Sequence, residues 1–143
     1  MKKTMDTHTI DTVFNGGMLF TAQVGGHNVP MDAGPADGGM DDAPSPKKLM
    51  LASLSGCTGI DIVSILNKMK VSFSDFSIKA EAQLSEDHPR IYNKVKLTYI
   101  IKLAEHDKVK MEKAVLLSQD KYCGVSAMFK AFAELRWTIH YLS

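Results

Sequence analysis

The strongest constraint on this fold is a long apolar segment with a cysteine near its middle, running from Ser45 to about Lys70. Ser45 followed by Pro46 indicates a helix start, because a serine hydroxyl caps free N–H groups and proline is tolerated at the first helical position. Beyond this start the polar face stays small until Lys68. A helix that is apolar almost all round is a buried one. The pattern therefore predicts a central, buried helix that carries Cys57.

The segments around this helix have the pattern of strands and shorter helices. Residues 8–32 hold strand formers separated by two glycine turns, which predicts a three-stranded meander. Residues 76–84 and 91–103 alternate apolar and polar positions, as in a sheet with one solvated face. Two helices are expected between residues 107 and 132, and residues 135–141 alternate again as a last strand. This order predicts an α+β fold with a mostly antiparallel sheet.

Residues 33–45, between the meander and the long helix, have a different composition. They are rich in glycine, proline and aspartate and show no periodicity, which predicts a mobile loop. A loop of this length in a small protein is typically either a lid or a disordered connector, and composition leaves both interpretations open.

Length and composition bound the class of protein. A chain of 143 residues with 45% apolar and 23% charged residues predicts one globular domain over residues 1–143. The net charge of +1 argues against a nucleic-acid partner and gives no reason to expect a membrane surface as partner. No uninterrupted apolar run is long enough to span a bilayer. Residues 1–6 have no apolar stretch behind them, so we expect no signal peptide and a cytoplasmic location.

The chain has two cysteines, Cys57 and Cys123. Their spacing, and the absence of paired histidines, argues against a zinc site, and no cofactor is expected. Each cysteine alone is most simply a small buried residue. Together they suggest redox chemistry, because a thiolate oxidised by peroxide to a sulfenic acid can be resolved by a second thiol. Spacing in the sequence does not decide whether the two thiols are adjacent.

The neighbours of the cysteines add weaker signals. Cys123 lies at an expected helix start beside Lys121, and both features favour a thiolate. Gly59 follows Cys57 closely and permits close approach of another backbone or of a ligand. Asp61 lies one turn after Cys57 on the same helical face, where it either orients a reactant or, as we favour, makes a structural hydrogen bond.

Two motifs resemble the OsmC/Ohr family of osmotically inducible and organic-hydroperoxide-resistance proteins, and in particular its YhfA-like branch. The first is Leu-Ser-Gly-Cys57-Thr-Gly-Ile-Asp61 in the long helix, and the second is Lys121-Tyr-Cys123 before an apolar helix. The resemblance extends over the whole chain. It implies an intertwined homodimer, with sheets wrapped around central helices that carry the cysteines.

The same resemblance implies a function. The protein would be a thiol-dependent peroxidase that reduces organic hydroperoxides in defence against oxidative stress, with Cys57 as the peroxidatic and Cys123 as the resolving cysteine. Electrons would return from a dithiol reductant, such as a lipoylated protein. No nucleic acid and no membrane is implied as a partner.

The sequence departs from the family pattern at two places. The family's catalytic arginine follows a Gly-Gly pair, where this chain has Met18, and its glutamate lies in the first turn of the cysteine helix, where this chain has Lys47 and Lys48. A lysine does not replace the planar fork of an arginine. Arg136 is the one stand-in that the sequence suggests, as an arginine supplied from elsewhere in the dimer.

These departures keep two other interpretations open. One is a catalytically degenerate dimer that binds an apolar ligand or acts as a redox sensor. The other is a redox-inert homologue whose cysteines are core residues.

Overall fold

The computed structural model describes residues 5–143. These residues divide into two compact units with a boundary between Leu49 and Met50, and each unit is described separately below. The structure is 37% helical and 33% strand with two small sheets, so the predicted α+β class is confirmed. The single domain over residues 1–143 stays a prediction. The prediction of no signal peptide rests largely on residues that lie outside the described part.

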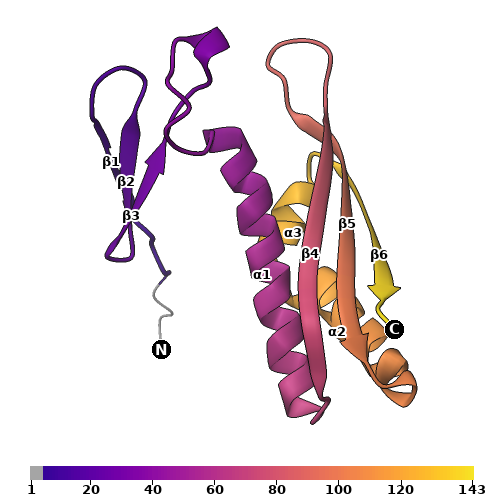
Figure 1. Cartoon of the computed structure of the whole chain (residues 1–143). Helices are drawn as coiled ribbons and strands as arrows, with labels where there is room; N and C mark the ends of the chain where they lie inside the picture. The colour runs from indigo at the N-terminus through magenta and orange to yellow at the C-terminus, as the bar shows by residue number, and fades with distance from the viewer. Residues whose placement is uncertain (1–4) are drawn as a thin grey trace. The chain divides into compact units, whose positions relative to one another are not determined.

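The first unit contains the predicted meander (Figure 1). Strands β1 (Asp11–Phe14), β2 (Phe20–Val24) and β3 (His27–Met31) pair antiparallel in this order. Gly25 and Gly26, with φ of 55° and 80°, connect β2 to β3. A two-residue connection with positive φ at both positions matches the right-handed twist of the flanking strands, and glycine adopts it without strain.

The loop after β3 is organised around one carboxylate. Asp32 is buried and accepts backbone N–H groups from Ala33 at 2.8 Å, Asp42 at 3.1 Å and Met40 at 3.3 Å. The bonds from Asp42 and Ala33 in particular lower the pKa of Asp32. A single 3₁₀ turn, η1 (Pro35–Asp37), lies inside the loop. The segment that composition predicted as mobile is therefore held by hydrogen bonds to a side chain outside it.

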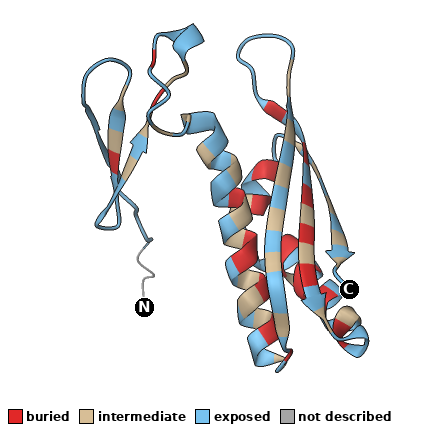
Figure 2. Ribbon diagram, in the orientation of Figure 1, coloured by how far each residue is buried: buried red, intermediate tan, exposed pale blue. Residues whose placement is uncertain are grey.

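Helix α1 (Pro46–Lys68) begins where the sequence predicts. Ser45 Oγ accepts the N–H of Lys48 at 3.4 Å, a long capping bond. In the single chain, one stripe of the helix is buried and the opposite side is exposed (Figure 2). Ile60, on the exposed side, keeps 73% of its surface accessible. The buried stripe consists of Leu54, Thr58, Gly59, Ile62 and Leu66.

Helix α1 is also long and apolar enough to cross a membrane, with a mean hydropathy of 1.8 over its best 18-residue window. Polar residues interrupt the apolar run in the sequence, so counting uninterrupted apolar residues did not predict a helix of spanning length here. Leu54, Ile62 and Leu66 pack in one core with residues of β5, so we interpret α1 as a core helix of the fold.

The carboxyl end of α1 carries a strained residue. Lys70 has a φ of 58°, its N–H donates to the Asn67 carbonyl, and the Val71 N–H donates to the Leu66 carbonyl. These bonds form a Schellman motif, in which the left-handed position is usually glycine.

We expect Lys70→Gly to raise the free energy of unfolding by about 0.5–1 kcal/mol. The left-handed conformation costs an ordinary residue about 1–2 kcal/mol, and the chain entropy of glycine offsets part of that gain. Urea denaturation measures the change. The control is Lys68→Gly, in the helical last turn of α1, which should lower stability. A loss of stability in Lys70→Gly would contradict the strain argument.

The sheet of the second unit has the order β4-β5-β6. Strand β4 (Phe73–Leu84) pairs antiparallel with β5 (Tyr92–Leu103), and β5 pairs parallel with β6 (Glu134–Tyr141). Both strand pairs of the first sheet and one of the two pairs here are antiparallel, so the predicted mostly antiparallel arrangement is confirmed. The parallel pair was not predicted; it requires a crossover, which the intervening helices supply.

The crossover contains helices that cover one face of this sheet (Figure 1). A 3₁₀ turn, η2 (Glu105–Asp107), leads into α2 (Lys108–Leu117), and α3 (Gly124–Lys130) precedes β6. Between α2 and α3 lies a π-helical turn, η3 (Ser118–Tyr122), where the sequence predicted only an interruption. The core between the helices and the sheet contains, among others, Leu54, Ile62, Leu66, Val95, Leu97, Tyr99, Ile101, Met111, Val115 and Phe129.

Candidate functional site

The two cysteines lie side by side in the second unit. Cys57 is in the middle of α1, and Cys123 immediately precedes α3. Their thiols are within hydrogen-bond range of each other, and both are free. Cys57 is half-buried, whereas Cys123 is only 3% exposed. The tertiary structure therefore supplies the adjacency that spacing in the sequence could not decide.

Two successive backbone N–H groups of α3 contact the two sulfurs. Cys123 is the N-cap residue of α3, and its Sγ accepts the N–H of Ser126 at 3.3 Å. The N–H of Val125 forms a hydrogen bond with Cys57. The start of α3 thus orients its own cysteine and also contacts the cysteine of α1. The predicted helix start at Cys123 is confirmed.

The surroundings of Cys57 favour its protonated form. Burial is the main cause that raises the pKa of the Cys57 thiol, followed by the hydrogen bond with Cys123. The N–H of Val125 lowers this pKa, and the negative charge of Asp61 raises it further. In the single chain, most Cys57 is therefore thiol at neutral pH, and the reactive thiolate is a minor form.

We expect alkylation of Cys57 by iodoacetamide to be slow at pH 7.5 and its rate to rise about tenfold per pH unit as the pH approaches 9. The thiolate is the reacting form, and the pKa of Cys57 lies above the ordinary value of 9.0. Peptide mass spectrometry of quenched samples gives the rate at each cysteine, and glutathione provides the reference thiol. A rate that levels off below pH 8 would show that the folded protein stabilises the thiolate.

Asp61 makes the structural hydrogen bond that the sequence analysis favoured. Its Oδ2 accepts the hydroxyl of Ser118 at 3.0 Å. Within residues 5–143, no three His, Cys, Asp or Glu side chains gather in a way that could hold a metal ion.

A buried group of polar side chains beside the cysteines was not predicted. The group, called the polar cluster below, comes from α1, β5, η3 and α3, and each of its members is at most 3% exposed. Its members are Thr58, Tyr99, Ser118, Gln119 and Ser126.

The sequence did contain a signal for this cluster. Ser118 and Gln119 follow Met111 by seven and eight residues, which places them on the buried stripe of α2 if the helical period continues. Thr58 lies between Leu54 and Ile62 at four-residue spacing on the buried stripe of α1. Polar residues at apolar positions of a periodic pattern were the signal.

The structure shows what two neighbours of the cysteines, Gly59 and Lys121, contact. A Cβ atom added to Gly59 would lie 3.1 Å from Cδ1 of Ile78, so this glycine permits close packing of α1 against β4. Lys121 Nζ lies 5.2 Å from the ring centroid of Tyr122, so its cation rests on an exposed aromatic ring.

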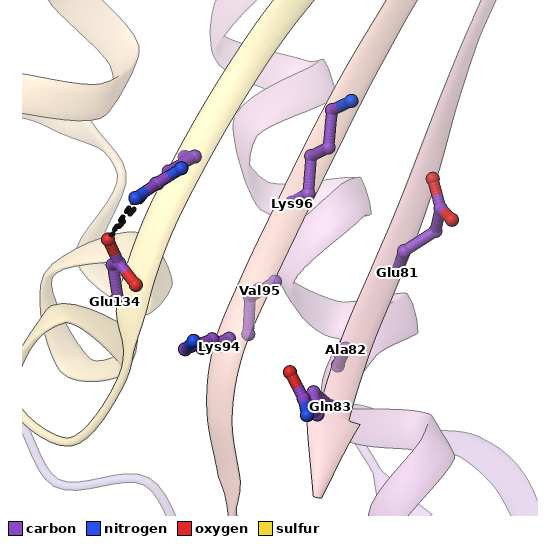
Figure 3. Close-up of a pocket in the computed structure, with 8 residues that line it drawn as sticks. Glu81, Ala82, Gln83, Lys94, Val95, Lys96 and Glu134 are labelled. Atoms are coloured by element: carbon purple, nitrogen blue, oxygen red, sulfur yellow. Dashed lines mark hydrogen bonds and ion pairs between the residues drawn. The ribbon is translucent and has the colours of Figure 1, made fainter.

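Neither arginine of the chain faces the thiols within the second unit. Arg136 forms an ion pair with Glu134 at 2.6 Å on the exposed face of β6. Figure 3 shows the same face of the β4-β5-β6 sheet. Glu81 of β4 and Lys94 and Lys96 of β5 line a shallow charged depression there. The alternation of β6 places Arg136 on the outer side, so it does not face the thiols of its own chain. Its role as a stand-in supplied from elsewhere in the dimer stays a prediction. Arg90 is exposed and donates to the carbonyl of Ser85.

The chain is similar to known proteins over most of its length. Residues 39–138 match the family model described as OsmC-like protein. Protein YhfA from Escherichia coli strain K12 is 32% identical over 115 residues, which are 80% of this chain and 83% of the relative. The family resemblance found in the sequence is thereby confirmed.

Solved structures share the fold. An OsmC-like protein of unknown function from Vibrio cholerae has a TM-score of 0.79 at 16% identity and covers 94% of this chain and 99% of its own. An organic hydroperoxide resistance protein from Elizabethkingia anophelis, with crystallant-derived thiocyanate bound, has a TM-score of 0.68 at 18% identity and covers 97% of this chain and 100% of its own.

Proposed function

This chain belongs to the OsmC-like protein family, and we propose that it is a thiol-dependent peroxidase that reduces organic hydroperoxides through Cys57 and Cys123. The single observation that carries the proposal is the hydrogen-bonded contact between a half-buried and a buried thiol. Membership of the family, and the organic hydroperoxide resistance proteins among its structural relatives, support a redox or peroxide-related role.

Exposure assigns the two roles. The thiol that attacks a hydroperoxide must be accessible, which fits Cys57, and the thiol that resolves the product can remain buried, which fits Cys123. The thiolate of Cys57 attacks the terminal oxygen of the hydroperoxide, the O–O bond breaks, and the alcohol leaves after taking up a proton. Cys57 is now a sulfenic acid.

The second step closes a disulfide. The Cys123 sulfur, after losing its proton, attacks Cys57 Sγ; the S–S bond forms, the S–O bond breaks, and the oxygen leaves as water. An external dithiol, for which a lipoylated protein is our candidate, then reduces the disulfide and is itself oxidised. The two electrons that reduce the hydroperoxide thus come from that dithiol.

The assembly belongs to the same proposal. We expect a homodimer, in which the side of α1 that is exposed in the single chain is covered by a second copy. Ile60 and Met50 on this helix are 73% and 45% exposed, more apolar surface than a core helix ordinarily leaves in water. Sedimentation equilibrium measures the mass directly, and a monomer at micromolar concentration would contradict this part.

The test of the function is the intact mass of the reduced protein after one equivalent of cumene hydroperoxide. We expect a loss of two hydrogens within seconds, which digestion without reductant maps to a Cys57–Cys123 bridge. Protein with both thiols still free after minutes would contradict the proposal. Reduction of the bridge by dihydrolipoamide, compared with glutathione, then tests the class of the reductant.

One observation favours a second function. Burial raises the pKa of Cys57, and no arginine of the described chain faces it in its own unit. A weakly reactive pair fits a degenerate dimer that binds an apolar ligand or senses oxidants slowly. An open groove of about 800 Å³ runs beside Gly56, Ile60 and Phe76. Native mass spectrometry of gently purified protein would show a retained lipid-like molecule if this function holds.

A further inference from the structure

The polar cluster has a defined direction of hydrogen bonding. A hydroxyl group has one proton to donate, and the Ser118 hydroxyl donates its proton to Asp61. In the 2.7 Å bond between Ser118 and Thr58, Thr58 is therefore the donor. In the 2.8 Å bond between Thr58 and Tyr99, the donor is then Tyr99. Burial raises the pKa of Tyr99, so its proton is present throughout the neutral range.

Gln119 is the branch point of this chain of bonds. Its side-chain Nε2 donates to the hydroxyl of Tyr99 at 2.9 Å and to the hydroxyl of Ser126 at 3.1 Å. The backbone N–H of Ser126 in turn donates to Sγ of Cys123. A continuous series of hydrogen bonds thus runs from the half-buried Asp61 of α1 to Ser126, whose backbone N–H binds the buried thiol of Cys123.

The backbone around Gln119 is fixed at the same place. The N–H of Cys123 donates to the Ser118 carbonyl at 2.8 Å and closes the π-helical turn. Lys130, at the end of α3, donates to the Gln119 carbonyl at 2.5 Å and pairs with Asp120 at 3.7 Å. The turn before Cys123 is therefore closed at Ser118, and the end of the helix after it is bonded to the Gln119 carbonyl. Single π-helical turns occur often at functional sites.

One atom of Gln119 is left without a partner. Its Oε1 is fully buried and accepts no hydrogen bond. A buried unsatisfied acceptor is destabilising, and a leucine would fill the same volume without this penalty. Packing alone therefore does not explain a glutamine at position 119. Its Nε2 fixes the positions of Tyr99 and Ser126 by hydrogen bonds.

We propose that Gln119 is a positioning residue that fixes Cys123 opposite Cys57 and so accelerates the closure of the disulfide. This inference rests on the proposed redox pair. Closure needs the buried sulfur within bonding distance and in line with the S–O bond of the sulfenic acid, so a small misplacement slows it strongly. The attack of Cys57 on a hydroperoxide makes no bond to Cys123. Cys123 raises the pKa of Cys57, so its displacement does not slow that first step.

The test separates the two steps in Gln119→Leu, with Gln83→Leu on the exposed face of β4 as matched control. After one equivalent of cumene hydroperoxide, consumption of the hydroperoxide reports the first step and intact mass reports the disulfide, while dimedone traps any sulfenic acid that has not yet closed. We expect the first step to be slowed by no more than twofold and closure to be at least tenfold slower, while Gln83→Leu matches the parent in both steps. Equal slowing of both steps, or unchanged closure, overturns the proposal.

A second measurement does not need a hydroperoxide. The equilibrium between the thiol pair and a mixture of oxidised and reduced dithiothreitol gives the effective concentration of Cys123 at Cys57. We expect a fall of at least tenfold in Gln119→Leu, and an unchanged value overturns the inference even if the protein proves inert towards peroxide. Should Gln119→Leu fail to fold, Ser126→Ala removes one acceptor of Gln119, and the same tenfold fall is then expected there.

Discussion

The Cys57→Ser variant is expected to consume cumene hydroperoxide no faster than a protein-free blank. Serine keeps the shape of the side chain, but its hydroxyl is not ionised at neutral pH and does not form a sulfenic acid. Cys123 does not substitute, because it is 3% exposed and Cys57 is the thiol that solvent reaches. Peroxide loss in the presence of excess dihydrolipoamide measures the effect.

The Cys123→Ser variant should behave differently. Its Cys57 still reacts once, and the sulfenic acid then persists or oxidises further, because the resolving thiol is missing. Dimedone should label this variant stoichiometrically at Cys57 and the parent hardly at all. Ser64→Ala, on the exposed side of α1, controls for changes in the helix. Full turnover in Cys57→Ser would assign the chemistry elsewhere and contradict the proposed function.

The second large effect concerns stability. We expect Phe129→Ala to lower the free energy of unfolding by about 3–5 kcal/mol, the usual result of deleting a buried aromatic ring and leaving a cavity. Phe129 is 2% exposed and belongs to the core beneath the β4-β5-β6 sheet. For a chain of this size the thermal midpoint should fall by roughly 2–4 °C per kcal/mol.

Phe132 provides the matched control. Its ring centroid lies 5.0 Å from that of Phe129, yet Phe132 is 39% exposed. Phe132→Ala should therefore cost about half as much or less, since less apolar surface leaves water there on folding. Both variants should be measured at one protein concentration, because association shifts the apparent stability. Equal losses would show that the exposed ring is covered in the assembled protein.

Most of the secondary structure could be predicted from the sequence. The two-residue period of residues 91–103 and the proline start of α1 are local signals, and both elements formed where expected. The glycine turn at Gly25 and Gly26 likewise depends on local backbone preferences. These elements are predictable because steric preference and periodicity act between neighbours in the chain.

The sequence-based prediction was wrong where the local structure depends on residues far away in the chain. Residues 118–121 looked like a break because they are polar, whereas the structure buries Ser118 and Gln119 in a π-helical turn. Their burial is tolerated because Thr58 and Tyr99, 60 and 20 residues away in the chain, supply hydrogen-bond partners. A window along the sequence contains no information about such partners.

For the cysteine site too, some features followed from the sequence and others only from the tertiary structure. The sequence by itself determined that a thiol lies in the middle of an apolar helix and that a second thiol starts another helix, because both follow from helix periodicity and capping. Only the tertiary structure decided that Cys57 and Cys123 lie within hydrogen-bond range, that Cys57 is the more exposed of the two, and that partial burial raises its pKa. Contact, exposure and desolvation depend on how α1, η3 and α3 pack together, and packing is a property of the folded chain as a whole.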